Sequence, residues 1–312
     1  MNEIYDVIIL GGGPAGLSAG LYAGRSRLKT LLLEKGAAGG QIALSAEVEN
    51  YPGQLLEGES GVTLAGRMAE QCARFGVERR TDTIQKVELT GEIKRLTGGL
   101  EEYQARTVII AAGASPRPIG CENEKEFVGR GVSYCATCDG AFFRGLDVYV
   151  AGGGDSAVEE AIFLTRFARK VTIIHRRDAL RAAKSIQEKA FAEPKIEFLW
   201  DSVVTRVDGT DVLNALTVKN VKTGEITVIQ APEADGMLGL FGFVGYLPNT
   251  ELFQEALPLE NGYIRTDEDM RTAIPGVFAA GDVRVKSLRQ VVTAAADGAI
   301  AAVQAERYLM GI

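Results

Sequence analysis

Residues 5–35 read YDVIILGGGPAGLSAGLYAGRSRLKTLLLEK, and residues 146–176 read LDVYVAGGGDSAVEEAIFLTRFARKVTIIHR. The two stretches align without a gap. Each runs from an apolar strand through a glycine turn into a helix and then a second apolar strand, the pattern of a dinucleotide-binding βαβ unit. One glycine motif alone is a weak signal, but two in this context predict an α/β protein with two Rossmann-like dinucleotide-binding domains. Two bound dinucleotides in one chain indicate electron transfer between them.

The first copy carries Gly11, Gly13 and Gly16. Glycines at this spacing give a tight turn, close approach of the backbone to a pyrophosphate, and close packing of helix on strand. The amide groups and the positive dipole end of the helix favour the phosphates. Glu34 ends the second strand, where a carboxylate accepts hydrogen bonds from ribose hydroxyls and repels a 2′-phosphate. This copy therefore predicts a site for FAD or NAD.

The second copy keeps glycines at Gly152 and Gly154 and has Ala157 in third place. A basic cluster replaces the carboxylate at the end of its second strand. This cluster consists of His175, Arg176, Arg177 and Arg181. Guanidinium groups suit a dianionic 2′-phosphate, so the second site is predicted to bind NADPH. The alternative is that the arginines only form a solvated loop after the strand.

Between the two copies lies CATCDG, residues 135–140. A CxxC pair can be half of a zinc site, a redox dithiol or chance. Structural zinc needs four ligands. Cys72 is interpreted as a buried apolar residue of a helix predicted over 61–75, Cys121 has no assigned role, and the one histidine belongs to the nucleotide segment. We therefore favour a redox dithiol, which a flavin and a nicotinamide could supply with electrons, and expect no metal.

Length and composition agree with this interpretation. A chain of 312 residues suits two domains, and its contents of 46% hydrophobic and 24% charged residues are typical of globular proteins. The net charge of −7 argues against nucleic acid or an anionic membrane as a partner. The first strand begins without a basic segment or cleavage site, and no apolar stretch is long enough to span a bilayer. We therefore expect a cytoplasmic protein, in which four cysteines suit catalysis.

Over essentially its whole length the chain resembles the bacterial low-molecular-weight thioredoxin reductases. CATCDG at 135–140 together with HRRDALRA at 175–182 is highly specific to this family. Further matching segments are GGGPAG (11–16), GGQ (39–41), ENYPG (49–53), GGGDSA (152–157), FVGYLPNTEL (243–252), GVFAAGDV (276–283) and RQVVTAAADG (289–298). The stretch 235–245, DGMLGLFGFVG, is a few residues longer than the family's usual run, which leaves its local geometry open.

The resemblance implies two cofactors and their ligands. FAD is expected to bind Gly11, Gly13, Pro14, Ala15, Gly16, Glu34, Lys35, Gly40, Gln41, Asn50, Gly113, Gly281, Asp282, Arg289, Gln290 and Val291, with Asp282 on the ribityl chain. NADPH is expected to bind Gly152, Gly154, Asp155, Ser156, His175, Arg176, Arg177 and Arg181. The implied activity is the reduction of thioredoxin by a homodimer, with electrons passing from NADPH to FAD and through the Cys135–Cys138 disulfide.

The resemblance also assigns roles within CATCDG. Cys138 is expected to lie against the flavin and Cys135 to attack the substrate, although the sequence itself does not rank the two thiols. The histidine acid–base of the larger disulfide reductases is not available, since the only histidine lies in the NADPH segment. Asp139 is the adjacent candidate for proton transfer. The alternative is that Asp139 caps the following helix.

Two other functions remain open at this point. The substrate could be another small disulfide protein. The chain could also be a flavin-binding redox sensor, although a sensor has little need for a complete NADPH site.

The order of the motifs predicts two domains, one inserted into the other. Residues 1–114 and 244–312 are expected to form a discontinuous FAD-binding domain. Residues 115–243 are expected to form the NADPH-binding domain, which also carries CATC. The Pro/Gly-rich segment 111–118 is a natural connection between them.

This arrangement predicts motion. Cys138 and Gly152 belong to the same inserted domain, yet both the dithiol and the nicotinamide have to reach one flavin. We therefore expect the inserted domain to swing about 115–118 and 242–245.

Overall fold

The computed structural model describes residues 3–36, 39–45, 48, 50–54 and 59–312. The chain divides into two compact units. Unit 1 comprises Met1–Ser115 and Leu247–Ile312, and unit 2 is the inserted segment Pro116–Tyr246. Each unit contains a sheet with one of the two glycine-turn βαβ motifs. The predicted fold class, α/β with two dinucleotide-binding domains and one inserted into the other, is confirmed.

The main sheet of unit 1 has the strand order β3-β2-β1-β6-β5-β4, and β19 also pairs with β6. Strands β1, β2, β3, β6 and β19 are parallel, and β5 and β4 continue the sheet as antiparallel strands. The bounds are β1 (Ile4–Leu10), β2 (Thr30–Glu34), β3 (Glu78–Thr81), β4 (Ile84–Glu88), β5 (Lys94–Gly98), β6 (Glu102–Ile110) and β19 (Val277–Ala279). The centre of the sheet is strongly apolar because parallel strands are covered on both faces.

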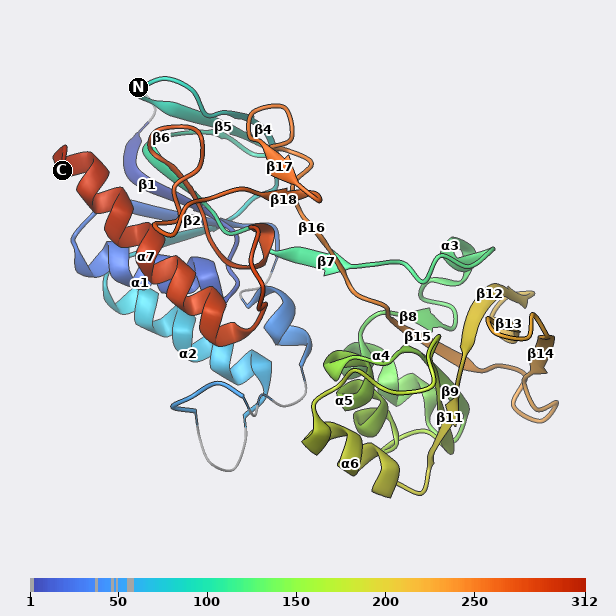
Figure 1. Ribbon diagram of the computed structural model, residues 1–312. Helices are drawn as coiled ribbons and strands as arrows, with labels where there is room; N and C mark the ends of the chain where they lie inside the picture. Colours follow the sequence, from blue (N-terminus) through green and yellow to red (C-terminus); the bar gives the residue numbers. More distant parts are fainter. Residues whose placement is uncertain (1–2, 37–38, 46–47, 49, 55–58) are drawn as a thin grey trace. The chain divides into compact units, whose positions relative to one another are not determined.

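Three helices cover one face of this sheet (Figure 1). They are α1 (Pro14–Arg25), α2 (Gly61–Arg74) and α7 (Val291–Met310). Val7 and Ile9 of β1 face these helices, whereas Ile8 and Leu10 face a second core that includes the antiparallel strands, as the alternation of a strand requires. A capping box between Gln290 and Thr293 begins α7. The last helix, α7, therefore packs on the same core as the first helix, α1.

Helices α1 and α7 pack closely because both present small residues. A Cβ atom added to Gly298 of α7 would lie 2.0 Å from the carbonyl oxygen of Ala15 in α1. A methyl group at this position would have to displace backbone atoms. The contact therefore requires glycine.

Replacing Gly298 by alanine is expected to lower the free energy of unfolding by about 1–3 kcal/mol. Gly66→Ala is the matched control, because a Cβ at Gly66 of α2 would meet nothing within 4 Å. That change should raise the free energy of unfolding by about 0.5–1 kcal/mol. Urea denaturation measures both. Equal effects of the two substitutions would contradict the close contact between α1 and α7.

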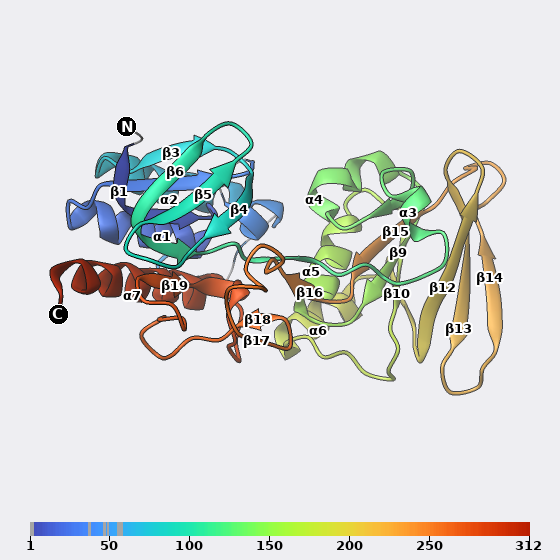
Figure 2. The same cartoon turned by 90° about the horizontal axis from the view of Figure 1, so that it is seen from above.

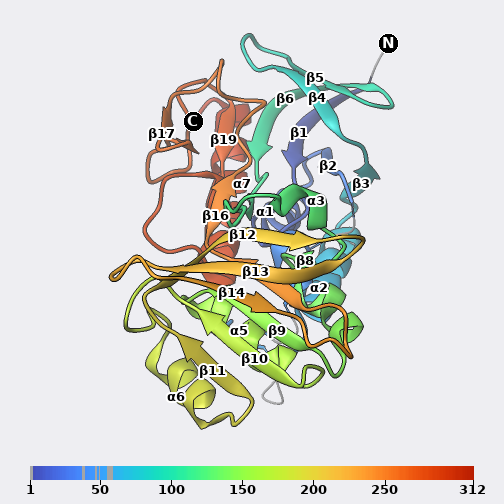
Figure 3. The same ribbon diagram turned by 90° about the vertical axis from the view of Figure 1, so that its right-hand side faces the viewer.

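Unit 2 is built around a parallel sheet with the order β11-β10-β9-β15-β8. Helices α5 and α6 share a core with one face, and the antiparallel sheet β12-β13-β14 packs on the other (Figures 2 and 3). The strand bounds are β8 (Val132–Ser133), β9 (Asp147–Gly152), β10 (Lys170–Ile174), β11 (Ile196–Leu199), β12 (Ser202–Gly209), β13 (Leu213–Asn220), β14 (Ile226–Gln230) and β15 (Gly239–Phe243). The α-helices are α3 (Glu124–Phe127), α4 (Ala136–Asp139), α5 (Asp155–Leu164) and α6 (Lys184–Ala192). The 3-10 helix η2 (Gly140–Phe143) directly follows α4.

The long stretch 235–245 supplies β15, an interior strand of the sheet that pairs with both β8 and β9. The connections between the units contain the short strands β7 (Ala114–Pro116) and β16 (Tyr246–Pro248), which pair with each other. The remaining elements of unit 1 are the 3-10 helices η1 (Gly40–Leu44) and η3 (Gly281–Val283) and the strand pair β17 (Leu259–Glu260) and β18 (Tyr263–Ile264). In the described part of the chain, no helix combines the length and the apolar character that crossing a membrane requires.

Candidate active site

The predicted FAD residues of unit 1 gather where parallel strands end. Gly11 follows β1, Glu34 ends β2, Gly113 follows β6, and Gly281 and Asp282 follow β19. Register pairs Leu10 with both Leu33 and Ile110, and Ile110 with Ala279, so these ends share one edge of the sheet. The carboxyl edge of a parallel sheet is where α/β proteins bind ligands.

The first glycine turn has room for a ligand in front of α1. Gly11 and Gly16 are needed for packing, because a Cβ at Gly16 would lie 1.8 Å from the carbonyl oxygen of Gly11, and Gly11 itself has φ +112°. Gly13 is different: its φ is −77°, and a Cβ there would approach only the Gly39 carbonyl oxygen, at 3.8 Å. Neither backbone strain nor packing requires this glycine. It leaves open space beside the first amide groups of α1, where Pro14 and Ala15 begin the helix.

Further predicted residues are tied to this turn by hydrogen bonds. The Gly12 amide donates to Glu34 Oε2, and the Lys35 amide donates to Glu34 Oε1 at 2.8 Å. The segment GGQ reaches the turn through the Gly39 amide, which donates to the Gly12 carbonyl oxygen at 2.7 Å. Gly40 and Gln41 then begin η1, and a Cβ at Gly40 would lie 3.3 Å from the Gly13 Cα.

Asp282 gives the clearest test of whether the site fits a polar ligand. Its Oδ1 is buried and has no hydrogen-bond partner among the described residues. Burial raises the pKa of Asp282, against the opposing effect of Lys286 and Arg289. A ribityl hydroxyl would supply the donor that this oxygen lacks, so the residues present fit FAD.

The C-terminal part of the predicted FAD site is also assembled. Asn50 Nδ2 donates to Gln290 Oε1 at 3.2 Å, which brings ENYPG to the start of α7, where Val291 is the first helical residue. Within that motif, Glu49 lies outside the described residues. The Arg289 guanidinium lies 4.0 Å from the centre of the Tyr263 ring, and its buried Nε has no partner among the described residues.

Asp297 is a buried residue that sequence reasoning did not select. Its Oδ2 accepts hydrogen bonds from the Gly281 amide at 3.0 Å and from Lys286 Nζ at 2.8 Å. Asp297 therefore holds the turn that presents Asp282. It stands in the matching segment RQVVTAAADG, but no spacing rule links it to Gly281.

The second glycine turn ends β9 in unit 2. A Cβ at Gly152 would lie 2.5 Å from the Phe243 carbonyl oxygen, so packing requires this glycine. At Gly154 a Cβ would meet nothing within 4 Å, and the φ of −94° is ordinary. This is again open space at the start of a helix, here α5. Asp155 Oδ1 accepts a hydrogen bond from the Ala183 amide at 2.7 Å, and Ser156 is exposed.

His175 is separated from the arginines of its cluster by burial. Its side chain is 4% exposed and lies against Gly153, where a Cβ would come within 2.3 Å of Nδ1. Burial and then the charge of Arg181 lower its pKa, so the imidazole is neutral near pH 7. Its Nε2 has no hydrogen-bond partner among the described residues. The His175 ring therefore packs against the backbone of the glycine turn.

The arginines are placed to meet an anion. Arg176, Arg177 and Arg181 are exposed after the carboxyl end of β10, next to the end of β9. The Arg181 amide donates to the Gly153 carbonyl oxygen at 2.7 Å, which ties the cluster to the turn. The neighbouring carboxylate of Asp178 pairs with Lys222 at 3.0 Å. The guanidinium groups suit a 2′-phosphate at this edge.

Cys135 and Cys138 form a disulfide, with their Cα atoms 5.3 Å apart. Cys135 is the N-cap residue of α4 and Cys138 lies within this helix, which follows shortly after β8; Cys138 is exposed whereas Cys135 is half-buried. Strands β8, β15 and β9 are parallel, so the disulfide lies at the same carboxyl edge of the sheet as the second glycine turn. A redox pair and a nucleotide turn therefore belong to one unit.

Asp139 is bound to the segment before the disulfide. Its Oδ2 accepts a hydrogen bond from Ser133 Oγ at 2.6 Å. Its side chain does not cap η2, the helix that follows. The structure thus provides no support for the helix-cap alternative. Ser133 is a second residue that sequence reasoning did not select.

The other two thiols are buried and poorly suited to exchange. Burial raises the pKa of Cys72 to about 11, and burial together with Glu124 raises that of Cys121 to about 12. Thiolates, not thiols, attack disulfides. The Cys135–Cys138 pair is thus the candidate for redox chemistry.

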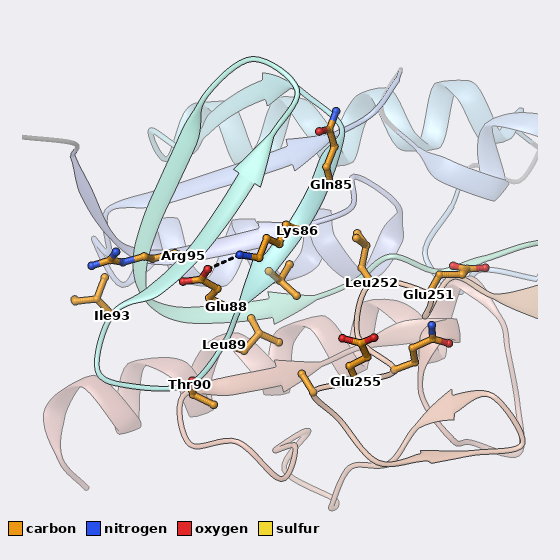
Figure 4. A pocket seen from close by; sticks show the side chains of 13 residues that line it. Gln85, Lys86, Glu88, Leu89, Thr90, Ile93, Arg95, Glu251, Leu252 and Glu255 are labelled. Carbon is orange, nitrogen blue, oxygen red and sulfur yellow. Dashed lines mark hydrogen bonds and ion pairs between the residues drawn. The ribbon is translucent and has the colours of Figure 1, made fainter.

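A pocket in unit 1 lies apart from these residues (Figure 4). It is lined by strands β4 and β5, the turn between them and the segment 251–256, and it holds an ion pair of 2.7 Å between Lys86 and Glu88. Among the described residues that line it, none is a predicted site residue. We assign it no part in the chemistry.

Comparison with known proteins defines the class. The family model described as pyridine nucleotide-disulphide oxidoreductase matches residues 5–298. A thioredoxin reductase of Peptoclostridium litorale is 57% identical over 99% of this chain and 98% of its own length. The solved thioredoxin reductase of Lactococcus lactis, in a state described as the FR conformation, is 47% identical over 99% of this chain and 100% of that one, with a TM-score of 0.94. The thioredoxin reductase of Streptococcus pyogenes is 48% identical over 100% of both chains, with a TM-score of 0.65.

The chain therefore belongs to the pyridine nucleotide-disulphide oxidoreductase family and, within it, to the thioredoxin reductases. Membership makes it an oxidoreductase whose family uses flavin and nicotinamide cofactors. The resemblance seen in CATCDG and HRRDALRA is confirmed.

Proposed function

We propose that this protein is an NADPH-dependent thioredoxin-disulfide reductase that holds FAD. The observation that carries the proposal is the Cys135–Cys138 disulfide at the same sheet edge as the second nucleotide turn. The relatives described above, all thioredoxin reductases, support thioredoxin as the substrate. A homodimer in the cytoplasm, expected from the sequence, stays a prediction.

The cofactors, when bound, supply a hydride from NADPH and a flavin that relays two electrons to the disulfide. Glu34 is proposed to hold the ribose of FAD and Asp282 the ribityl chain. The open space at Gly13 and Gly154 supports a pyrophosphate beside each helix start. Arg176, Arg177 and Arg181 are proposed to bind the 2′-phosphate and so to select NADPH.

The dithiol is proposed to act by exchange. Cys135 attacks the disulfide of thioredoxin, and Cys138 then attacks Cys135 and releases the reduced product. Asp139 is proposed to carry the proton between the sulfur atoms. No histidine is available for this step, because the ring of His175 packs under Gly153 in the nucleotide turn.

The relay requires unit 2 to move as one body, which we also propose. The dithiol after β8 and the nucleotide turn after β9 share one sheet, and both have to serve one flavin. The solved relatives from Lactococcus lactis and Streptococcus pyogenes support such motion. They are 47% and 48% identical to this chain, yet their TM-scores are 0.94 and 0.65. Such a difference at nearly equal identity supports a different arrangement of large parts in these two relatives.

Turnover of the purified flavoprotein tests the proposed function. The protein should be yellow and release FAD on denaturation. It should oxidise NADPH steadily when given thioredoxin and a chromogenic disulfide, and NADH far more slowly. A protein that is reduced by NADPH but does not turn over with thioredoxin would be a reductase of another disulfide protein or a redox sensor. Equal rates with NADH would contradict the nucleotide assignment.

A further inference from the structure

Ser133 connects the predicted acid–base residue to the cysteine pair. It is the last residue of β8 and is 4% exposed. Its Oγ lies 2.6 Å from Asp139 Oδ2, 3.0 Å from the Cys135 amide nitrogen and 3.3 Å from the Cys135 carbonyl oxygen. One hydroxyl group therefore contacts both ends of α4.

The Ser133 hydroxyl has a single proton, which decides the contact in which it is the donor. A hydroxyl has one proton to donate and two lone pairs that accept. The Cys135 amide donates to one lone pair. The single proton goes to Asp139, because that contact is shorter and its acceptor is a carboxylate. Oδ2 of Asp139 is thus held, and Oδ1 lies outside this hydrogen bond.

We propose that Ser133 is a positioning residue for thiol–disulfide exchange: its hydroxyl fixes the Asp139 carboxylate and the Cys135 backbone in one arrangement. The inference rests on the proposed function of the dithiol. It assigns to Ser133 no contact with substrate or cofactor. Its effect passes through Asp139.

The arrangement of Ser133, Asp139 and Cys135 affects the proton transfer during thiol–disulfide exchange. The thiolate of one cysteine attacks the partner disulfide, so that a mixed disulfide forms and one sulfur of the partner leaves as a thiolate. The second cysteine loses its proton and attacks the mixed disulfide, which restores the Cys135–Cys138 bond and releases the partner as a dithiol. Two electrons move from the enzyme to the partner. One proton of the partner dithiol comes from the second enzyme thiol, by way of Asp139, which accepts it and returns it to a leaving sulfur. The other, which the attacking thiol released when it became a thiolate, comes from solvent.

The next residue provides a matched control. The Tyr134 hydroxyl donates to Glu124, a buried carboxylate that also accepts hydrogen bonds from the amides of Ile119 and Gly120, both at 2.7 Å. Ser133 and Tyr134 thus each place one hydroxyl on a carboxylate. Only the carboxylate bound by Ser133 belongs to the cysteine motif.

The test uses holoenzyme reduced with dithiothreitol, desalted, and mixed with two disulfides. The thiolate that leaves from hydroxyethyl disulfide is strongly basic and needs a proton. The thiolate that leaves from dithiobis(nitrobenzoate) is weakly basic and leaves without one. Ser133→Ala should slow the first reaction about tenfold and the second less than about threefold. Ser133→Thr, which keeps a hydroxyl, should restore most of the loss. Tyr134→Phe should affect both disulfides alike.

Two results would overturn the inference. One is an equal effect of Ser133→Ala on the two disulfides, which would indicate a merely structural role. The other is an unchanged rate with both. Reduction of the flavin by NADPH at the wild-type rate shows that the variant is folded. Neither small disulfide is thioredoxin. Wild-type enzyme that does not reduce thioredoxin would therefore refute the proposed substrate and leave the inference on Ser133 intact.

Discussion

Replacing either Cys135 or Cys138 by serine is expected to bring thioredoxin reduction to background, a loss of about three orders of magnitude or more. Serine cannot form the disulfide that receives the electrons. NADPH should still bleach the flavin, because hydride transfer to FAD needs neither sulfur. Stopped-flow absorbance and steady-state turnover measure the two steps separately.

Cys72→Ala is the control for this experiment. Cys72 is fully buried, and its Sγ donates to the Leu17 carbonyl oxygen in the core of unit 1. The variant should keep turnover even if its stability falls. Thioredoxin turnover that persists in either serine variant would show that the dithiol is not the relay.

Replacing Arg176 and Arg177 together by glutamine is expected to reduce the preference for NADPH over NADH roughly a hundredfold or more. Each charge-assisted contact contributes about 1.5–3 kcal/mol, and the loss should fall on the Michaelis constant for NADPH. NADH has no 2′-phosphate and should be affected little. Steady-state kinetics with both nucleotides give the ratio.

Arg166→Gln provides a matched loss of charge in the same unit. Arg166 follows α5 and lies over the Phe163 ring at 5.3 Å from its centre, away from the predicted 2′-phosphate contacts. The Arg166→Gln variant should leave the preference for NADPH over NADH unchanged. If the double variant lost NADPH and NADH binding equally, these arginines would not read the 2′-phosphate.

Local patterns were sufficient for much of the fold. The repeat at 5–35 and 146–176 predicted the two βαβ motifs, because apolar runs and glycine turns are set by neighbouring residues. The helix predicted over 61–75 is α2, Gly61–Arg74, which has an apolar stripe that local periodicity reveals.

Contacts between distant or irregular segments were not predictable in this way. The antiparallel sheet β12-β13-β14 has no motif, and its role in covering unit 2 depends on tertiary packing. Ser133 and Asp139 meet because a strand ends and a single turn of helix follows, which no periodicity encodes. Asp297 reaches Gly281 through the packing of α7. The burial of His175 likewise depends on the absence of a side chain at Gly153.

The close packing of α1 against α7 has a consequence for synthesis of the chain. Unit 1 is formed by the two ends of the chain, whereas unit 2 is one continuous segment, Pro116–Tyr246. A ribosome therefore delivers all of unit 2 before it delivers the helix that completes unit 1. Unit 1 therefore begins to form before unit 2 and is completed after it, and until α7 emerges the face of α1 that receives Gly298 stays uncovered. The nascent chain must keep that apolar surface from aggregation until α7 has been made.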